Sequence, residues 1–432
     1  MNLAEILIPA AVILVALAIL NIPIYIDILA ATLYIAVFVV HVPVESIFTG
    51  MFDNIAKTSF LCIPFFVLTG TLMQESSLGM RLINFFMILL RSTKAGLAIA
   101  CLLANAVFGA ISGSSPAAVA TFGKIIYEPL AKVQGQSLST GIITSSGALS
   151  TIIPPSIMLI IFGVATETSV TKLFMAGILP GLLLVVVVSV YLIWKCSKNA
   201  ALGIYESGIG EKAGLSEIRK TFVEAIPVLV LPVIILGGIY SGIFTPTEAG
   251  AVAAVYTALI SIVLLRDIRL KHIPGYLAEA CKVTCQIFVL IAVSTCFAQV
   301  ATMAQLPVMI TAGFSDFNRV SFLLMLNILL LIVGCLFDTG AAILILAPLL
   351  APAAKALMID PVHLGIVFTV NLSIGMFTPP FGLNIFVSQS ILKKPMGEIS
   401  RAVLPYIILY IIGLFIITYL PGISLLLPNL LV

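Results

Sequence analysis

The chain has 432 residues, of which 61% are hydrophobic and only 9% are charged, and its formal net charge is +3. An average soluble domain is roughly 45–50% apolar and about 25% charged, so this composition excludes an ordinary soluble protein. The mean hydropathy is +1.24. Apolar runs such as 182–190 are continuous, whereas a transmembrane β-barrel would alternate apolar and polar residues. The small net charge gives no indication of nucleic-acid binding. The sequence therefore predicts an all-α polytopic membrane protein.

Several uninterrupted apolar runs have the length of about 17–25 residues that a membrane-spanning helix needs. They lie at 4–20, 24–41, 59–75, 172–195, 222–243, 247–265, 282–300 and 403–420. No basic segment precedes the first run, so we expect it to remain as a span and not to be cleaved as a signal peptide. Two further apolar regions, 95–165 and 320–391, are interrupted by clusters of Gly, Ser, Thr and Pro.

Each interrupted region is interpreted as a re-entrant helical hairpin followed by one broken transmembrane helix. We expect the hairpins at about 95–133 and 320–357, and the broken helices at about 136–165 and 361–391. The chain then crosses the membrane an even number of times, with both termini on the same side. If that side is the outside, nearly all of the 21 basic residues fall in the cytoplasm, as the positive-inside rule expects. The exceptions are Lys57, Lys172, Arg319 and Lys355.

The two interrupted regions also form an internal repeat, because a shift of 225 residues aligns their helix breaks without a gap. The aligned positions include Gly109 with Gly334, Ser114 with Thr339, and Pro154-Pro155 with Pro379-Pro380. An odd number of crossings separates the hairpins, so the second enters from the opposite face. We expect inverted repeats at 1–197 and 221–432, joined by a polar cytoplasmic linker at 198–220. Inverted repeats with broken helices are typical of secondary transporters.

The clusters that break the helices bring hydroxyl and carbonyl oxygens, which carry no charge, into otherwise apolar sequence. Unwound backbone inside a bilayer must have its amides and carbonyls satisfied by protein, ions or substrate. Hydroxyl and carbonyl oxygens without a fixed charge suit a desolvated Na⁺, and half-helices that begin at the breaks favour an anionic substrate group. Asp338 is an acid at the tip of the second hairpin. We expect it to bind a cation or orient the substrate, with capping of the following helix as the alternative.

An enzyme is not expected. The three histidines lie away from the serine clusters, and the sequence contains no Gly-x-Ser-x-Gly or His-Glu-x-x-His motif. It also lacks the Gly-x4-Gly-Lys-Ser/Thr loop that binds ATP. We therefore expect no cofactor, and energy from an ion gradient.

Four stretches, at 108–121, 153–156, 359–365 and 371–384, resemble the large membrane subunit of tripartite ATP-independent periplasmic (TRAP) transporters. The resemblance covers nearly the whole chain. Met358 departs from the expected glycine before Ile-Asp-Pro. The resemblance implies the ion-transporter superfamily fold, in which a transport domain moves like an elevator against a scaffold. It also implies Na⁺-coupled uptake of an organic acid, either a C4-dicarboxylate or sialic acid, across the bacterial inner membrane. In that membrane, the charge distribution predicts that both termini are periplasmic.

The resemblance implies partners as well. A soluble periplasmic binding protein would deliver the substrate, and a small four-helix membrane subunit is expected as a separate chain. Two alternatives stay open at this point: a stand-alone Na⁺/dicarboxylate carrier of the same superfamily, and a channel or structural membrane subunit.

The family's two cation sites fall on the clusters identified above, and the substrate would lie between the hairpin tips. The expected cation ligands are Ser112, Gly113, Ser115, Gly147, Thr151 and Pro154 in the first half, and Gly334, Asp338, Thr339, Gly340, Gly375, Thr378 and Pro379 in the second. The expected substrate contacts are Ser114, Ser115, Thr339, Asn371 and Asn384.

Overall fold

The computed structural model describes residues 3–20, 22–201, 213–314 and 316–431, and every regular element in these ranges is a helix. Seven described helices are long and apolar enough to cross a membrane, and two bent helix pairs would raise the number to nine. The predicted class, an all-α polytopic membrane protein, is confirmed. The bent pairs are Val44–Asp53 with Thr58–Glu75, and Gln136–Ile152 with Ile157–Ala165.

The first half of the chain contains the helices up to α11. They are α1 (Leu3–Ile19), α2 (Ile24–Tyr34) with its π-helical continuation η1 (Ile35–Val40), α3 (Val44–Ile55), the 3-10 turn η2 (Thr58–Leu61), α4 (Cys62–Glu75), α5 (Leu78–Leu90), α6 (Gly96–Ser112), α7 (Ser115–Gln134), α8 (Gln136–Ser146), α9 (Leu149–Ile152), α10 (Ile157–Ala165) and α11 (Val170–Ala201).

The second half repeats this order of long, short and interrupted helices. It contains α12 (Leu215–Tyr240), α13 (Pro246–Leu259) with η3 (Ile260–Leu264), η4 (Leu270–His272), α14 (Ile273–Met303), α15 (Leu306–Gly313), α16 (Arg319–Leu336), α17 (Thr339–Ala356), α18 (Pro361–Gly375), α19 (Leu383–Leu392), α20 (Met396–Tyr419) and α21 (Gly422–Leu431). The arms α6 and α7, and α16 and α17, occupy the segments where the hairpins were predicted. The inverted relation of the two halves stays a prediction.

The helices at the two hairpin tips end and begin for local reasons. Gly113 ends α6 in the left-handed conformation, with φ of 62°, which glycine adopts without a steric penalty. The Ser114 side chain then accepts a hydrogen bond from the amide of Ala117 at the start of α7. At the second tip, the Asp338 carboxylate caps α17 by accepting from the amides of Gly340 and Ala341. Both breaks thus satisfy part of their own backbone.

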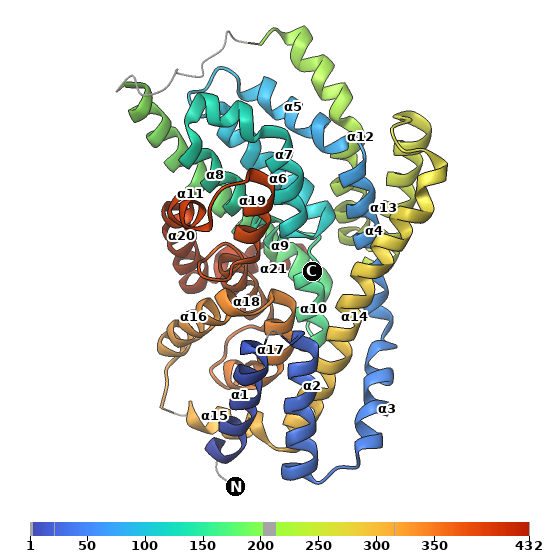
Figure 1. Ribbon diagram of the computed structural model, residues 1–432, viewed down its shortest axis with the longest axis vertical. Coiled ribbons are helices and arrows are strands. Elements are labelled where there is room, and N and C mark those ends of the chain that lie inside the picture. The colour runs from blue at the N-terminus through green and yellow to red at the C-terminus, as the bar shows by residue number, and fades with distance from the viewer. Residues whose placement is uncertain (1–2, 21, 202–212, 315, 432) are drawn as a thin grey trace.

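Helix α14 connects the two ends of the molecule. In Figure 1, α1, α2, α3 and α15 lie towards one end of the long axis, and α5, α7 and the start of α12 towards the other. Helix α14 runs diagonally between these groups and packs against α2, α3, α4 and α17. A small apolar core joins it to the first group, with Ile28, Ile35 and Phe297 buried together. A larger core fills the rest of the molecule.

Several predicted bounds were inaccurate. The predicted span 282–300 is part of a longer helix, α14 (Ile273–Met303), because its first turns carry polar residues that an apolar-run criterion omits. Helices α3 and α5 were missed for the same reason, since each has a polar and an apolar face. The predicted linker 198–220 was too wide: α11 continues to Ala201, α12 begins at Leu215, and 202–212 lie outside the described residues.

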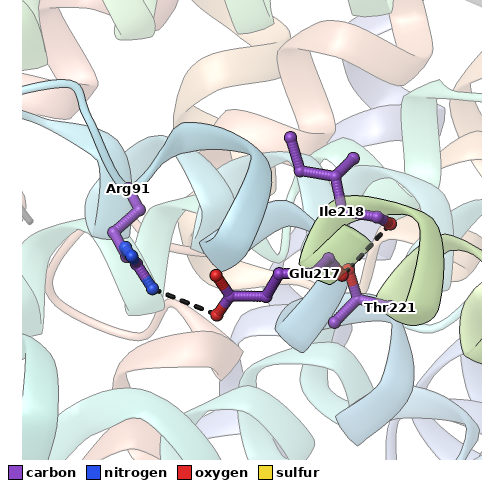
Figure 2. A network of polar contacts seen from close by, with 4 residues as sticks. All are labelled: Arg91, Glu217, Ile218 and Thr221. Carbon is purple, nitrogen blue, oxygen red and sulfur yellow. Dashed lines mark hydrogen bonds and ion pairs between the residues drawn. The ribbon is translucent and has the colours of Figure 1, made fainter. Parts of the chain in front are cut away.

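The start of α12 is held against the end of α5. The Arg91 guanidinium lies 3.1 Å from the Glu217 carboxylate, and Figure 2 shows this ion pair reaching from the end of α5 to the start of α12. The Thr221 hydroxyl donates to the carbonyls of Glu217 and Ile218, each at 3.1 Å. The rings of Phe85 and Phe222 also pack, with centroids 5.6 Å apart. These contacts therefore join α5, a helix of the first half, to α12, the first helix of the second half.

Candidate binding site at the two helix breaks

A cavity of about 440 Å³ lies between the two hairpin tips. Its lining comes from the tip between α6 and α7, the start of α17 and the short helix α10, together with a wall made by α4 and the first half of the long helix α14. Its volume lies within the range of small-molecule sites. The polar residues that line it are Thr71, Gln74, Ser112, Ser114, Ser115, Thr151, Glu279, Gln286 and Asp338, together with Gly113 and Gly340.

The first tip presents hydroxyl groups on a tightly packed backbone. Ser112 and Ser115 are buried. A Cβ on Gly113 would lie 2.8 Å from a side-chain carbon of Ile157, so no larger residue fits there without a shift. The Ser115 hydroxyl contacts the amide group of Asn384, with the amide nitrogen 2.8 Å away. This contact orients Ser115 from a residue 269 positions along the chain.

The second tip leaves a buried hydroxyl without a partner. Thr339 follows the capping residue Asp338 and is 1% exposed, yet its Oγ1 has no hydrogen-bond partner. It lines a second, smaller cavity of about 140 Å³. The other lining residues are Gly334, Leu336, Phe337, Asp338, Met376, Phe381 and Leu383. A buried polar atom without a hydrogen-bond partner is unfavourable unless a ligand supplies one. The unpartnered hydroxyl oxygen of Thr339 therefore suits a bound cation.

Each hairpin packs against the broken helix that follows it through a very close contact. A Cβ added to Gly109 on α6 would lie 2.1 Å from the Cβ of Ser150 on α9. A Cβ added to Gly375 on α18 would lie 2.2 Å from the carbonyl carbon of Gly334 on α16. These four residues are the pairs that the 225-residue shift aligns. Equivalent hairpins therefore contact equivalent broken helices at equivalent positions.

The breaks of the two broken helices also contact each other. The hydroxyl oxygens of Thr151 and Ser373 lie 2.6 Å apart, and both side chains are fully buried. Thr151 comes from the first half and lines the larger cavity. Ser373 comes from α18 in the second half. The two halves of the chain therefore contact each other beside the larger cavity.

The structure divides the predicted residues into two groups. Of the residues predicted as cation ligands or substrate contacts, those that line the larger cavity are Ser112, Gly113, Ser114, Ser115, Thr151, Asp338 and Gly340. Those that line the smaller cavity are Gly334, Asp338 and Thr339. Gly147 and Gly375 lie in tight packing contacts, and the Thr378 hydroxyl donates to the carbonyl of Ile374 at 2.7 Å. Pro154 and Pro379 each precede the second proline of a helix break and line neither cavity.

Two predicted substrate contacts have positions that point to a packing role. The Asn371 side-chain amide donates to Asn327 on α16 at 2.8 Å and to the carbonyl of Val367. The Asn384 amide donates to Ser115 and, at 3.1 Å, to the carbonyl of Thr144. Both side chains are fully buried and line neither cavity. Their hydrogen bonds connect the hairpins to the broken helices away from the two cavities.

The sequence reasoning missed the opposite wall. Gln74 lies at the end of α4, and Glu279 and Gln286 lie on the first half of α14. Each is polar within or beside an apolar run, which is the available signal. Glu279 was missed because the predicted span began at 282, whereas Gln74 and Gln286 fell inside the predicted spans 59–75 and 282–300 as single uncharged residues. The described residues contain no group of three or more His, Cys, Asp or Glu side chains that could hold a metal ion, so a cation here would be bound mainly by neutral oxygens.

Comparisons with known proteins show which family the chain resembles over nearly its whole length. Residues 11–423 match the family model described as "Tripartite ATP-independent periplasmic transporter, DctM component". The C4-dicarboxylate TRAP transporter large permease protein of Pseudomonas aeruginosa is 42% identical over 391 residues, covering 89% of this chain and 90% of that protein. The protein of the same description from Rhodobacter capsulatus is 36% identical, covering 97% and 98%.

Two further relatives differ in what their descriptions state. The sialic acid TRAP transporter large permease protein of Vibrio cholerae is 34% identical, with 88% of each chain covered. The isethionate TRAP transporter permease protein DctMQ of Oleidesulfovibrio alaskensis is also 34% identical, and the match covers 94% of this chain but 64% of that protein.

Solved structures of more distant proteins share the fold. The YdaH transporter of Alcanivorax borkumensis superposes with a TM-score of 0.64 at 14% identity, with 88% of each chain covered. MtrF of Neisseria gonorrhoeae superposes with a TM-score of 0.57 at 11% identity, covering 87% of this chain and 83% of that chain. The resemblance stated from the sequence motifs is confirmed by the family match, and the chain belongs to the family of the DctM component of tripartite ATP-independent periplasmic transporters.

Proposed function

We propose that this protein is the large membrane subunit of a secondary transporter that couples the uptake of an organic anion to sodium entry. The observation that carries the proposal is the cavity between the two helix breaks. Ser115 at the start of α7 and Gly340 in the first turn of α17 both line it, and helix N-termini favour negative charge. Hydroxyl oxygens at the same breaks, including the unpartnered Thr339 Oγ1, are suited to Na⁺.

The proposed substrate class is a C4-dicarboxylate. Relatives from Pseudomonas aeruginosa and Rhodobacter capsulatus that cover most of this chain are described as C4-dicarboxylate permeases. A relative described as a sialic acid permease has a similar overall identity to the second of these, so other organic acids are the alternatives to test. A volume of about 440 Å³ accommodates either class.

The proposed mechanism is an elevator movement. The hairpin tips and broken helices form a unit joined by the Ser115–Asn384 and Thr151–Ser373 contacts. Helices α4 and α14 form the other wall of the cavity. Movement of the first unit along these two helices would carry the site across the membrane without dismantling the ligand positions.

The proposed partners are a small membrane subunit and a soluble periplasmic binding protein, and the proposed location is the bacterial inner membrane with both termini periplasmic. Membership of the family supports the partners and the membrane, and the distribution of basic residues supports the placement of the termini. The proposal includes a small subunit on a separate chain. This point needs its own test, because the DctMQ relative extends well beyond the matched region.

The proposal is tested by reconstituting the protein with both partners in proteoliposomes and measuring the uptake of radiolabelled succinate. We expect saturable uptake that requires an inward Na⁺ gradient and the binding protein. Uptake driven by a pH gradient without Na⁺ would overturn the sodium assignment. Flux that does not saturate would instead indicate a channel, and full uptake without the binding protein would indicate a stand-alone carrier.

A further inference from the structure

The wall of the cavity formed by α4 and α14 carries one ionisable residue, Glu279 on α14. Among the described residues, the only other ionisable group in the lining is Asp338 at the second tip, and none of these residues places a Lys, Arg or His in the cavity. A site for an anion therefore has two acidic groups and no basic group in its described lining.

The two acids differ in their surroundings. The Asp338 carboxylate accepts hydrogen bonds from the amides of Gly340 at 2.9 Å and Ala341 at 3.3 Å, and these amides offset part of its charge. Glu279 is exposed and forms neither a hydrogen bond nor an ion pair within the described part of the chain. Lys282, one turn further along α14, is exposed but does not line the cavity.

Glu279 also differs from Asp338 in the part of the molecule that carries it. Asp338 belongs to the hairpin tip, so it stays beside the substrate when the tip moves. Glu279 belongs to α14, which packs against α2, α3 and α4 as well as against the hairpin arm α17, and which lines the cavity beside α4. A charge on that wall acts on the substrate only while the tips face this segment of α14.

We propose that Glu279 is an anion-release residue: its carboxylate repels the bound anion and so lowers the affinity of the site while the tips face the end of α14 that carries Lys282, which is the end predicted to lie in the cytoplasm. The proposal rests on the proposed function, since it needs an anionic substrate and a site that moves past α14. A group that interacts with the ligand in only one of two states changes the affinity of that state alone. Glu279 thereby favours net release over rebinding.

The test is inhibition of uptake by substrate on the opposite side. Proteoliposomes that contain the full complex are loaded with increasing unlabelled succinate, and the internal concentration that halves uptake is measured. Replacing the charge in Glu279→Gln should lower that concentration by about three- to tenfold, as expected for one unit charge acting across a partly hydrated site. Glu279→Lys should lower it further, and Glu279→Asp should resemble the wild type.

Glu75→Gln is the matched control, because Glu75 is exposed at the end of α4 beside the lining residue Gln74 but does not line the cavity. It should leave the half-inhibiting concentration unchanged. The difference between wild type and Glu279→Gln should also shrink in high choline chloride, since salt screens an exposed charge.

The outcomes separate the two proposals. Normal sodium-driven uptake with equal half-inhibiting concentrations across the Glu279 series would overturn the release role and leave the proposed function intact. An equal shift in Glu75→Gln would also overturn it, because a general surface-charge effect would then explain the result. Wild-type protein without uptake of any organic anion would overturn the proposed function, and the release role with it.

Discussion

The hydroxyl groups of Thr151 and Ser373, from the broken helices of the two halves, contact each other with their oxygens 2.6 Å apart. Thr151 Oγ1 also lies 2.8 Å from the carbonyl oxygen of Ala148, and Ser373 Oγ lies 2.5 Å from that of Thr369. Two hydroxyl protons thus serve three short contacts, so only two of them can be hydrogen bonds at once. The breaks meet in a region rich in oxygen atoms and poor in donors, which suits a nearby cation.

Removing the unpartnered hydroxyl at the second tip should weaken sodium binding without weakening the fold. Thr339→Val keeps the shape of the side chain and removes Oγ1, which is buried and unpartnered. We expect the Na⁺ concentration for half-maximal uptake to rise by about three- to tenfold, as for the loss of one ligand worth roughly 0.6–1.4 kcal/mol. The melting temperature should be unchanged or higher. Thr339→Ser is the control and should retain wild-type sodium dependence, whereas a lower melting temperature of Thr339→Val would show a structural role.

The close contact between α16 and α18 should tolerate no side chain. Gly375→Ala would place a Cβ 2.2 Å from the backbone of Gly334, so the helices must separate, and we expect a loss of roughly 3 kcal/mol of stability. In Gly397→Ala the new Cβ meets nothing within 4 Å, and this control on α20 should be neutral or gain up to about 1 kcal/mol. Melting temperatures in one detergent compare the two variants. Equal values would mean that the contact is looser than described.

The predicted topology can be tested with single cysteines. Cys281 and Cys285 are exposed, so both are first replaced with alanine. Because Arg319 is predicted outside and Lys198 in the cytoplasm, a membrane-impermeant maleimide added to intact spheroplasts should label Arg319→Cys. Lys198→Cys should react only after permeabilisation. Labelling of both positions from the same side would contradict the inverted repeats.

The ion pair at the start of α12 should contribute little. The side chains of Arg91 and Glu217 are 35% and 43% exposed, and exposed pairs are typically worth less than about 1 kcal/mol. Glu217→Gln should therefore change the melting temperature slightly at low salt and not at all at high salt. A large loss that persists at high salt would show that this pair, more than the packing of Phe85 against Phe222, holds α12 to α5.

The positions of the helix breaks could be predicted from the sequence because their causes are local. Glycine permits the left-handed turn at Gly113, and proline removes the amide that a continuous helix needs at Pro154 and Pro379. The apolar composition predicted the membrane fold for a similar reason, since a bilayer requires long apolar helices. The motifs around these breaks also carried the family resemblance that the family match confirmed.

The surroundings of those breaks were decided by the tertiary structure, because the groups that meet there come from distant segments. Asn384 contacts Ser115 across 269 residues, and Asn371 contacts Asn327 on the neighbouring hairpin, so both side chains have partners that no local pattern specifies. Glu279 lies on a turn of α14 that a search for apolar runs leaves out. The sequence alone determined where the helices break and which oxygen atoms are available there. Packing decided which of those atoms face a cavity, since burial depends on neighbours that no local pattern specifies.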